Sequence, residues 1–372
     1  MNLEAHLIEL PVSEAAAFRA VAGRLRAAPE LEPSADLTAR ILDAVDAERA
    51  RRRRRPANPA PWWGAVAAAA GLIAAVTLFR SPAPSRSSPA APPESGLAWL
   101  AGSQEPDGAW DPLKHGGAAE YRSALTALSA LALARAPDRY AEHVRRACGA
   151  LAAQQTADGA FGGAGRSQFY NQAITTYALA ALSPQRPELK PVLERAIGFV
   201  SARQSAQGGW DYEAGSEGNA ALTAWQVRAL ACAAEQGCAG ADIPLRRGLR
   251  WLRGSARDDG SVAYHRGSGL RSESLTALAA YALITAGKTF PELPPLGQHV
   301  ARTLTAGSGA QAGADCYRDY AKVLALDAAG AEKLADAVRG QMLKHQTAGA
   351  EDQWGAVGGR LYMTALTALA AK

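Results

Sequence analysis

The order of hydrophobic and polar positions divides the chain into stretches of different character. Residues 13–28 and 35–55 place apolar side chains at helical spacing among charged ones, which predicts two amphipathic helices. Residues 62–79 (WWGAVAAAAGLIAAVTLF) carry no charge, and residues 80–95 are rich in Pro and Ser, as in an extended linker. From 96 to 372, Ala and Leu dominate and strand-forming residues are scarce, so this part is predicted to be all-α.

The uncharged segment 62–79 has the length of a membrane-spanning helix. Its 18 residues would span about 27 Å, close to the roughly 30 Å hydrocarbon core of a bilayer. Trp62 and Trp63 begin it, and the five arginines of 51–55 precede it. Because positive residues stay in the cytoplasm, we predict a single-pass protein of the bacterial inner membrane with a cytoplasmic N-terminus. The part after the span would be periplasmic or extracellular. A buried Ala-rich core helix is the alternative.

The helical region 1–61 has a recognisable layout: an acidic SEAAAF helix, an APEL turn, and a helix that runs into arginines before the apolar span. Over residues 1–80 this layout resembles the cytoplasmic half of membrane anti-sigma factors, which implies a sigma factor as a cytoplasmic partner. The zinc-binding His and CxxC pattern of many anti-sigma factors is absent, because His6 has no cysteine before Cys148. The alternative is a tail that serves only as an anchor.

A unit of about 50 residues recurs from residue 96 to the end. Each unit has a helical segment, a turn that contains Gly and ends in an aromatic residue, and a second helix rich in Ala, Leu and Thr. The turn aromatics Trp110, Phe161 and Trp210 are 51 and 49 residues apart, and Val262 takes this place 52 residues further on. The fifth unit lacks the turn motif, and Trp354 marks the sixth. Six helical hairpins make twelve helices, which can close into a ring that buries their apolar stripes.

The polarity of the helices assigns them to two rings. The second helix of each unit is apolar on nearly all sides, as in residues 124–134, and belongs inside. The first helix carries charges and belongs outside. In the turns, glutamines can bond free backbone groups and glycines permit the tight bend. These positions are Gln104, Gln155 and Gln204, and Gly108, Gly159 and Gly209. The turn aromatics Trp110, Phe161, Trp210 and Trp354 are predicted to be buried against the helix ends.

The aromatic-x-x-x-x-Gln-x-x-x-Gly-x-Trp units, with Trp99-Leu100 and Trp251-Leu252, resemble the QW motifs of squalene and oxidosqualene cyclases. Prenyltransferase subunits contain these motifs in degenerate form. The resemblance covers 96–372 and implies an (α/α)6 toroid of six helical hairpins. The stretch from Asp315 to Leu366 also resembles the ending of bacterial proteins with prenyltransferase and squalene oxidase repeats.

The motifs that carry catalysis in these families are missing. Squalene-type cyclases protonate an alkene with a DxDD motif, and here the nearest acidic pair, Asp258-Asp259, falls in a turn. Protein prenyltransferases bind zinc through Asp-x-Cys and a His, whereas Asp315 and Cys316 are adjacent. The sequence therefore predicts no catalytic residue, no metal and no cofactor, and argues against an enzyme.

Charge and cysteines add two points. The formal charge is +5, but five basic residues form the single run 51–55, so no nucleic-acid partner is predicted. Cys232 and Cys238 could close a disulfide loop if this part lies outside the cytoplasm, or they could be buried thiols. The sequence leaves both possibilities open.

Polar residues at the start of the inner helices form the candidate site. When the units are aligned on Thr126 and its equivalents, every unit has a polar residue four positions earlier. One end of the toroid should then present a bowl of aromatic and hydrogen-bonding groups around the central opening, where toroid relatives bind ligands. The predicted ligand-binding residues are Tyr121, Arg122, Tyr170, Asn171, Asn219, Glu273, Tyr317, Asp319, Arg360 and Tyr362. Arg122 and Arg360 could hold one carboxylate or phosphate across the seam between the first and sixth units.

The predicted function is a membrane-anchored, non-catalytic binding module. It would hold a peptide, glycan or lipid group in the bowl and signal to the cytoplasmic tail. Two alternatives stay open: a terpenoid cyclase or prenyltransferase-like enzyme with an unrecognised site, and an anti-sigma-like transmembrane regulator. The sequence specifies neither the ligand nor the oligomeric state.

Overall fold

The computed structural model describes residues 93–371 apart from 164, 213–215, 289, 307–314 and 349–354. The chain divides into two units, Met1–Arg86 and Ser87–Lys372, and every described residue belongs to the second. The predictions for 1–61, for 62–79 and for most of the linker therefore fall outside the described residues.

The described residues form twelve α-helices joined by turns and short 3-10 segments, which agrees with the predicted all-α class. In chain order the helices are α5 (Pro93–Gly102), α6 (Arg122–Leu133), α7 (Pro137–Gln154), α8 (Arg166–Leu182), α9 (Lys190–Ala202), α10 (Ala220–Glu235), α11 (Asp242–Arg253), α12 (Glu273–Thr285), α13 (Leu293–Ala306), α14 (Cys316–Ala328), α15 (Glu332–Ala348) and α16 (Gly355–Ala370). Within this part of the chain β-pairing is limited to two isolated bridges.

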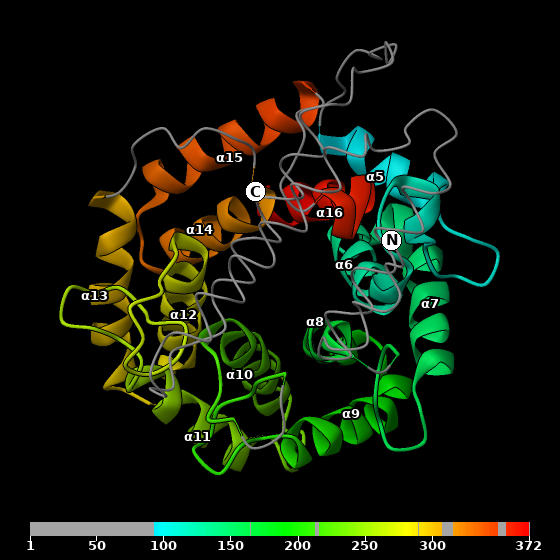
Figure 1. Ribbon diagram of the computed structural model, residues 1–372. Helices are drawn as coiled ribbons and strands as arrows, with labels where there is room; N and C mark the ends of the chain where they lie inside the picture. Colours follow the sequence, from blue (N-terminus) through cyan, green and yellow to red (C-terminus); the bar gives the residue numbers. More distant parts are fainter. Residues whose placement is uncertain are drawn as a thin grey trace, which may run out of the picture. The chain divides into compact units, whose positions relative to one another are not determined.

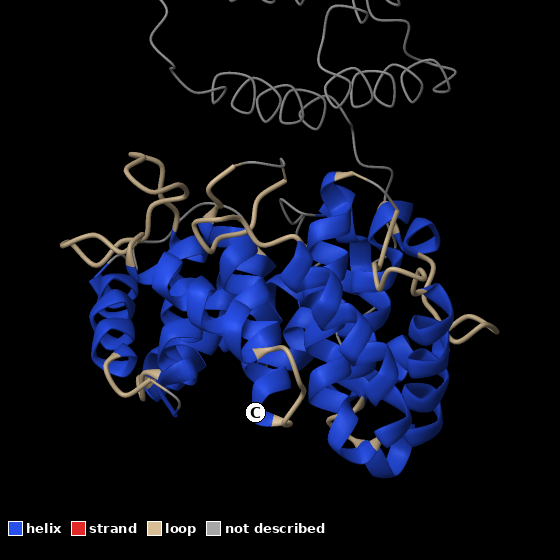
Figure 2. Cartoon of the chain, turned by 90° about the horizontal axis from the view of Figure 1, so that it is seen from below, coloured by secondary structure: helices blue, strands red, loops and turns tan. Residues whose placement is uncertain are grey.

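The helices of the second unit form two concentric rings (Figure 1). The even-numbered helices α6 to α16 pack each against the next, and α16 packs against α6, which closes the inner ring. The odd-numbered helices α5 to α15 lie outside and pack against inner helices. Figure 2 shows the helices standing side by side, with most loops at their two ends.

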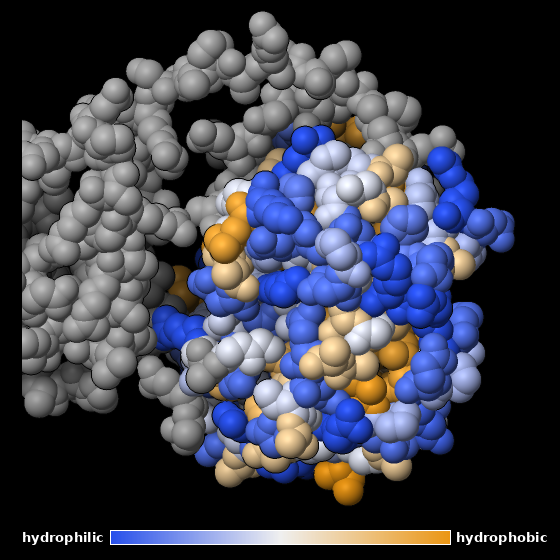
Figure 3. All heavy atoms as spheres, turned by 90° about the vertical axis from the view of Figure 1, so that its right-hand side faces the viewer, coloured by the Kyte–Doolittle hydropathy of each residue, from blue (hydrophilic) through white to orange (hydrophobic). Residues whose placement is uncertain are grey.

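Burial follows this arrangement. In α6 every residue after Arg122 is buried, whereas α7 buries one face, including Tyr140, Val144 and Leu151. Figure 3 shows the side on which α7 lies, where hydrophilic residues cover most of the described surface. Because an all-apolar helix must be enclosed and an amphipathic one needs solvent on one face, the two rings follow from the sequence pattern.

Four turns share one hydrogen-bond pattern. In the first unit the N–H of Glu105 donates to the oxygen of Ala109 at 2.8 Å, and the N–H of Gly108 donates back to Glu105 at 2.9 Å. The same pair of bonds recurs at Thr156, Ser205 and Arg257. The fourth turn therefore keeps the backbone geometry although Val262 replaces the aromatic.

The repeated glutamines connect neighbouring units. Gln204 Nε2 donates to the oxygen of Gly208 at 2.8 Å and to that of Pro244, in the first turn of α11, also at 2.8 Å. Gln104 and Gln155 make the same two kinds of bond, to their own turn and to the next outer helix. Each glutamine thus satisfies backbone oxygens in two successive units, as the sequence predicted.

The turn aromatics are buried, as predicted. Trp110, Phe161 and Trp210 are 0% exposed. The indole N–H of Trp110 donates to the oxygen of Leu100 at 2.8 Å, and that of Trp210 donates to Val200 at 2.8 Å. The side chains therefore fill the core while their polar atoms stay bonded. Trp354, the fourth aromatic of this prediction, lies outside the described residues.

One of the predicted turn glycines needs correction. Gly108 and Gly159 have positive φ angles of 87° and 90°, but in the third unit Gly208, with φ of 96°, makes the bend instead of Gly209. The N–H of Gly208 bonds back to Ser205, which is the bond that closes the turn in the other units. The sequence contains two consecutive glycines here, and only the turn geometry distinguishes their roles.

The transmembrane prediction is also corrected. Among the described residues, no helix is both long and apolar enough to cross a membrane. The apolar α12 has 13 residues, about 20 Å, and the 18-residue α7 carries charges such as Asp138 and Arg145. The single-pass membrane location and the periplasmic placement of the toroid, which depended on this helix, are withdrawn. The segment 62–79 itself lies outside the described residues.

The four cysteines are free thiols. Cys238 is buried and Cys232 is half-buried, and burial raises the pKa of Cys232 to about 11. The sequence left open whether Cys232 and Cys238 form a disulfide or are thiols, and in the structure they are thiols.

Both ends of the inner ring are bonded across its seam. Near the start of the inner helices, the N–H of Ala118 donates to the oxygen of Val357 at 2.8 Å. At the other end, Arg135 Nη2 donates to the oxygen of Ala371 at 2.6 Å. Units one and six are therefore neighbours.

Candidate functional site

All ten predicted site residues lie at or near the N-terminal ends of inner helices. Tyr121 and Arg122 lie at the start of α6, Tyr170 and Asn171 in the second turn of α8, Asn219 at the N-cap of α10, Glu273 at the start of α12, Tyr317 and Asp319 at the start of α14, and Arg360 and Tyr362 just after Gly359 interrupts α16. Side-chain bonds between these ends show that the residues share one end of the ring, which we call the mouth. Their individual roles differ.

The two asparagines are structural. Asn171 is 0% exposed, accepts the N–H of Ala124 at 2.8 Å and donates to the oxygen of Glu120 at 2.6 Å, so it joins α8 to the start of α6. Asn219 is also 0% exposed and caps α10 by accepting the N–H of Leu222 at 2.9 Å. Their side chains are fully used within the protein, so they are removed from the candidate site.

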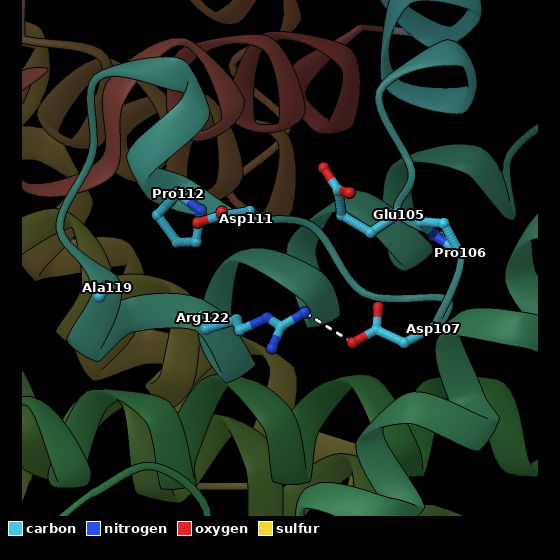
Figure 4. A pocket seen from close by; sticks show the side chains of 7 residues that line it. All are labelled: Glu105, Pro106, Asp107, Asp111, Pro112, Ala119 and Arg122. Carbon is cyan, nitrogen blue, oxygen red and sulfur yellow. Dashed lines mark hydrogen bonds and ion pairs between the residues drawn. The ribbon is translucent and has the colours of Figure 1, made fainter.

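Arg122 belongs to a depression outside the ring's centre. It reaches from α6 to Asp107, with 2.7 Å between Nη2 and Oδ2, as Figure 4 shows. The N–H of Ala109 and the Arg122 guanidinium hold the pKa of Asp107 below its usual range. The depression measures about 430 Å³ and is lined by Glu105, Pro106, Asp107, Asp111, Pro112, Ala119 and Arg122.

The other acidic groups of this depression also have partners. Glu105 pairs with Lys114 at 2.7 Å, and Asp111 accepts the N–H of Leu113 at 3.0 Å. The depression is therefore the polar side of the first turn, and we assign it no ligand.

Arg360 lies at the seam. Its guanidinium stacks over Trp99 at 4.3 Å from the ring centroid, and His115 meets the same ring edge-on at 5.0 Å. Burial and the neighbouring Arg360 lower the pKa of His115. Arg122 and Arg360 thus have different partners, and their joint use for one anion stays a prediction.

Five half-buried tyrosines form what we call the tyrosine cluster: Tyr121, Tyr170, Tyr212, Tyr264 and Tyr317. They come from five successive units. The rings of Tyr170 and Tyr212 are 6.2 Å apart, and Phe169 meets Tyr212 edge-on at 5.8 Å. Burial is the largest cause for every member and raises its pKa, to about 12 for Tyr121. Tyr170 raises the pKa of the other four further, whereas hydrogen bonding with Tyr212 partly offsets the rise at Tyr170 and Tyr264. At neutral pH the cluster is therefore uncharged, with phenol hydroxyls and ring faces.

The charged mouth residues of units four and five form a network of ion pairs. Arg318 Nε lies 2.8 Å from Asp319 Oδ1 and 3.9 Å from Glu273 Oε2, and Lys322 Nζ lies 3.4 Å from Glu273. Asp319 and Lys322 are buried. The N-cap carboxylate of Asp315 also acts on Arg318. Glu273 and Asp319 therefore serve to join α12 to α14, and carboxylates match both cations of the network.

Two side-chain bridges cross the centre of the inner ring. Trp225 Nε1 donates to Tyr317 Oη at 3.0 Å, and Arg228 Nη2 donates to Tyr320 Oη at 3.0 Å. Both bridges run from α10 to α14, which are not neighbours in the ring. Arg228 follows Trp225 by three residues on α10, and Tyr320 follows Tyr317 by three residues on α14. The two helices therefore run parallel, and the second bridge lies about 4.5 Å further from the mouth than the first.

The guanidinium of Arg228 is enclosed by aromatic rings. Its carbon lies 4.0 Å from the ring centroid of Tyr177, 5.0 Å from Tyr281, 5.1 Å from Trp225 and 5.6 Å from Tyr320. Arg228 is 5% exposed. We call these five residues the Arg228 cage; they come from α8, α10, α12 and α14.

The comparisons with known proteins agree with this architecture. Residues 122–282 match the family described as the squalene-hopene cyclase C-terminal domain. This segment carries squalene cyclase-like repeats. It begins at the first residue of α6 and ends within α12, so it includes the inner helices of the first three units and most of the fourth. No curated protein matches the chain.

In the squalene cyclase-like segment, Asp259 of the Asp258-Asp259 pair, the pair most similar to DxDD, is held in its ionised form. Asp259 accepts hydrogen bonds from Ser261 and pairs with Arg271 at 2.7 Å, and these contacts lower its pKa. An acid that protonates an alkene needs the opposite environment, one that favours its protonated form. Among the described residues, no group of three or more His, Cys, Asp or Glu is positioned to hold a metal.

Sequence reasoning missed the Arg228 cage and two members of the tyrosine cluster. A signal was present, because Arg228 is a charged residue in the middle of a helix rich in Ala and Leu. Arg228 and Tyr281 also each follow an aligned threonine, Thr223 or Thr276, by five residues. Tyr212 and Tyr264 each stand two residues after the turn aromatic position in their units. An alignment restricted to the helix starts could not reveal either.

Proposed function

We propose that the squalene cyclase-like toroid is a non-catalytic binding module that holds an organic ligand at its mouth. The observation that carries the proposal is the tyrosine cluster, in which five units each direct one phenol to the same end of the ring. Ring faces suit an apolar or planar group, and hydroxyls supply hydrogen bonds that fix its orientation. A peptide, glycan or lipid group fits this description.

The enzyme alternative receives support from the family match but is disfavoured by charge. Cyclisation of an alkene passes through carbocations, which aromatic rings stabilise through their negative faces. In the Arg228 cage four such rings already surround a guanidinium. A second cation there would be repelled at short range in a dry environment, and the low pKa of Asp259 argues against an alkene-protonating acid in this turn.

The proposal is tested with the full-length chain and two volume-matched variants. Tyr212→Leu alters the tyrosine cluster, whereas Tyr140→Leu alters a tyrosine of the outer helix α7. Each purified protein is exposed to a bacterial small-molecule extract, and the retained compounds are identified by mass spectrometry and titrated by calorimetry. We expect the wild type and Tyr140→Leu to retain the same saturably bound compound and Tyr212→Leu to retain much less. Equal retention by both variants would refute a ligand site at the tyrosine cluster.

A further inference from the structure

Arg228 is an unusual residue for its position. It lies in the middle of α10, whose neighbouring residues from Ala220 to Leu230 are all buried. A buried charge is normally paired with an opposite charge or bonded through all its donors. The groups around Arg228 therefore show which hydrogen-bond acceptors and which negative charge it lacks.

The guanidinium has donors without a protein acceptor. Nη2 donates to Tyr320, but Nε and Nη1 have no hydrogen-bond partner among the described residues. In the same part of the chain Arg228 makes no ion pair with a carboxylate. The aromatic rings stabilise the cation through their faces, yet they do not replace an acceptor for these N–H groups.

The neighbouring groups do not supply a negative charge. Burial raises the pKa of Tyr281 to about 12 and that of Tyr320 above its ordinary value, so both phenols are neutral at physiological pH. The carboxylates at the mouth ends of α12 and α14 interact with Arg318 and Lys322, and among the described residues none of them pairs with Arg228. The Arg228 cage itself thus supplies no negative charge to its guanidinium.

The cage lies directly below the tyrosine cluster. Tyr317 belongs to the cluster and forms the first bridge with Trp225, and Arg228 follows Trp225 by one helical turn on α10. A ligand that enters at the mouth and extends past this bridge would reach the guanidinium. A single positive charge in a dry site matches one negative charge, whereas a phosphate dianion would remain undercompensated.

We propose that the ligand is an organic monocarboxylate, whose apolar body contacts the tyrosine cluster and whose carboxylate accepts hydrogen bonds from Arg228. This inference rests on the proposed function, because it specifies the ligand of the same mouth. Charge-assisted bonds to a guanidinium in a water-poor site distinguish a carboxylate from a neutral group of equal shape.

The test uses the full-length chain and three probes that share one shape. These are 3-phenylpropanoate, its neutral amide and 3-phenylpropylammonium, each titrated by calorimetry and by ligand-observed NMR. The wild type should bind the carboxylate at least about tenfold more tightly than the amide, and the ammonium most weakly. Arg228→Met should abolish this preference while amide binding persists. Arg228→Lys, which keeps the charge, should retain part of the preference.

The matched control is Arg203→Met. Arg203 also stacks on an aromatic ring, with its guanidinium carbon 4.7 Å from the ring centroid of Phe199, but it is exposed on the outer ring. This control should leave all three affinities unchanged. Circular dichroism and thermal unfolding show whether each variant folds. If Arg228→Met does not fold, Arg228→Lys takes its place in the comparison with the wild type.

The outcomes separate the inference from the proposed function. If the wild type binds carboxylate and amide equally, or if a folded Arg228→Met keeps the preference, the carboxylate assignment is overturned while the binding mouth stands. If the wild type binds none of the three probes, the inference fails and the mouth as a site for small organic ligands fails with it.

Discussion

The close contact between each turn and the next outer helix makes a quantitative prediction for Gly159. This residue has φ of 90°, and a Cβ placed on it would lie 2.2 Å from the backbone oxygen of Arg195 in α9. For an alanine here, the left-handed conformation would cost about 1–2 kcal/mol. Displacing a packed helix backbone adds about 1–3 kcal/mol. We therefore expect Gly159→Ala to lower the free energy of unfolding by about 2–5 kcal/mol.

Two other glycines separate these contributions. Gly116 has φ of 80°, and a Cβ added to it would have no heavy atom within 4 Å, so Gly116→Ala should cost only the conformational part, about 1–2 kcal/mol. Gly149 is an exposed residue inside α7 with open space around it, and Gly149→Ala should stabilise by about 0.5–1 kcal/mol.

The assay is urea denaturation of the full-length variants, monitored by tryptophan fluorescence. The dependence of the free energy of unfolding on urea concentration is compared between variants. The close approach of turn and helix would be refuted if Gly159→Ala cost no more than Gly116→Ala. A destabilising Gly149→Ala would contradict the helical, exposed position of that residue.

Three further predictions concern other parts of the toroid. Gln204→Ala leaves two backbone oxygens without their donor and should cost about 2 kcal/mol in urea denaturation; a cost below about 0.5 kcal/mol would show that solvent replaces it. Because burial raises the pKa of Tyr281 from 10.0 to about 12, the folded state holds this proton longer than the unfolded state. The contribution of this group to the free energy of unfolding is fully present below pH 10 and is lost as the pH rises from 10 to 12. Tyr281→Phe should therefore reduce the loss of stability when the free energy of unfolding is measured across this pH range. Arg135→Ala removes the bond to the oxygen of Ala371 and should speed amide exchange in the last turn of α16 but not in α10; unchanged exchange there would mean that the seam does not depend on this arginine.

The repeat and its rings were predictable because they depend on local information. The regular spacing of Trp110, Phe161 and Trp210 indicates a repeated unit in which the turn aromatic occupies the same local environment each time. The burial of all three residues confirms this prediction. The glutamine bonds were also foreseen, since a helix junction has free backbone groups. The choice between Gly208 and Gly209 was not predictable, because both residues tolerate positive φ and the turn's hydrogen bonds decide between them.

The mouth was predicted as a location but not in its composition. A polar residue near the start of an inner helix can face the opening or bond to the adjacent helix, and the sequence pattern is the same in both cases. Asn171 and Asn219 bond within the protein, whereas Tyr170 and Tyr317 join the tyrosine cluster. Tyr212 and Tyr264 reach the same place from turns, which an alignment of helix starts does not include.

The sequence by itself determined the helical class, the period and the assignment of helices to two rings, because amphipathicity and turn chemistry act within a single unit. Only the tertiary structure decided which side chains meet at the centre. The bonds from Trp225 to Tyr317 and from Arg228 to Tyr320 each join residues 92 positions apart on helices that are not neighbours in the ring. Such contacts exist only after the ring closes, since closure brings the inner faces of non-adjacent helices within reach of one another. The charge of Arg228 is visible in the sequence, but its isolation from every carboxylate of the described chain is a property of the closed ring.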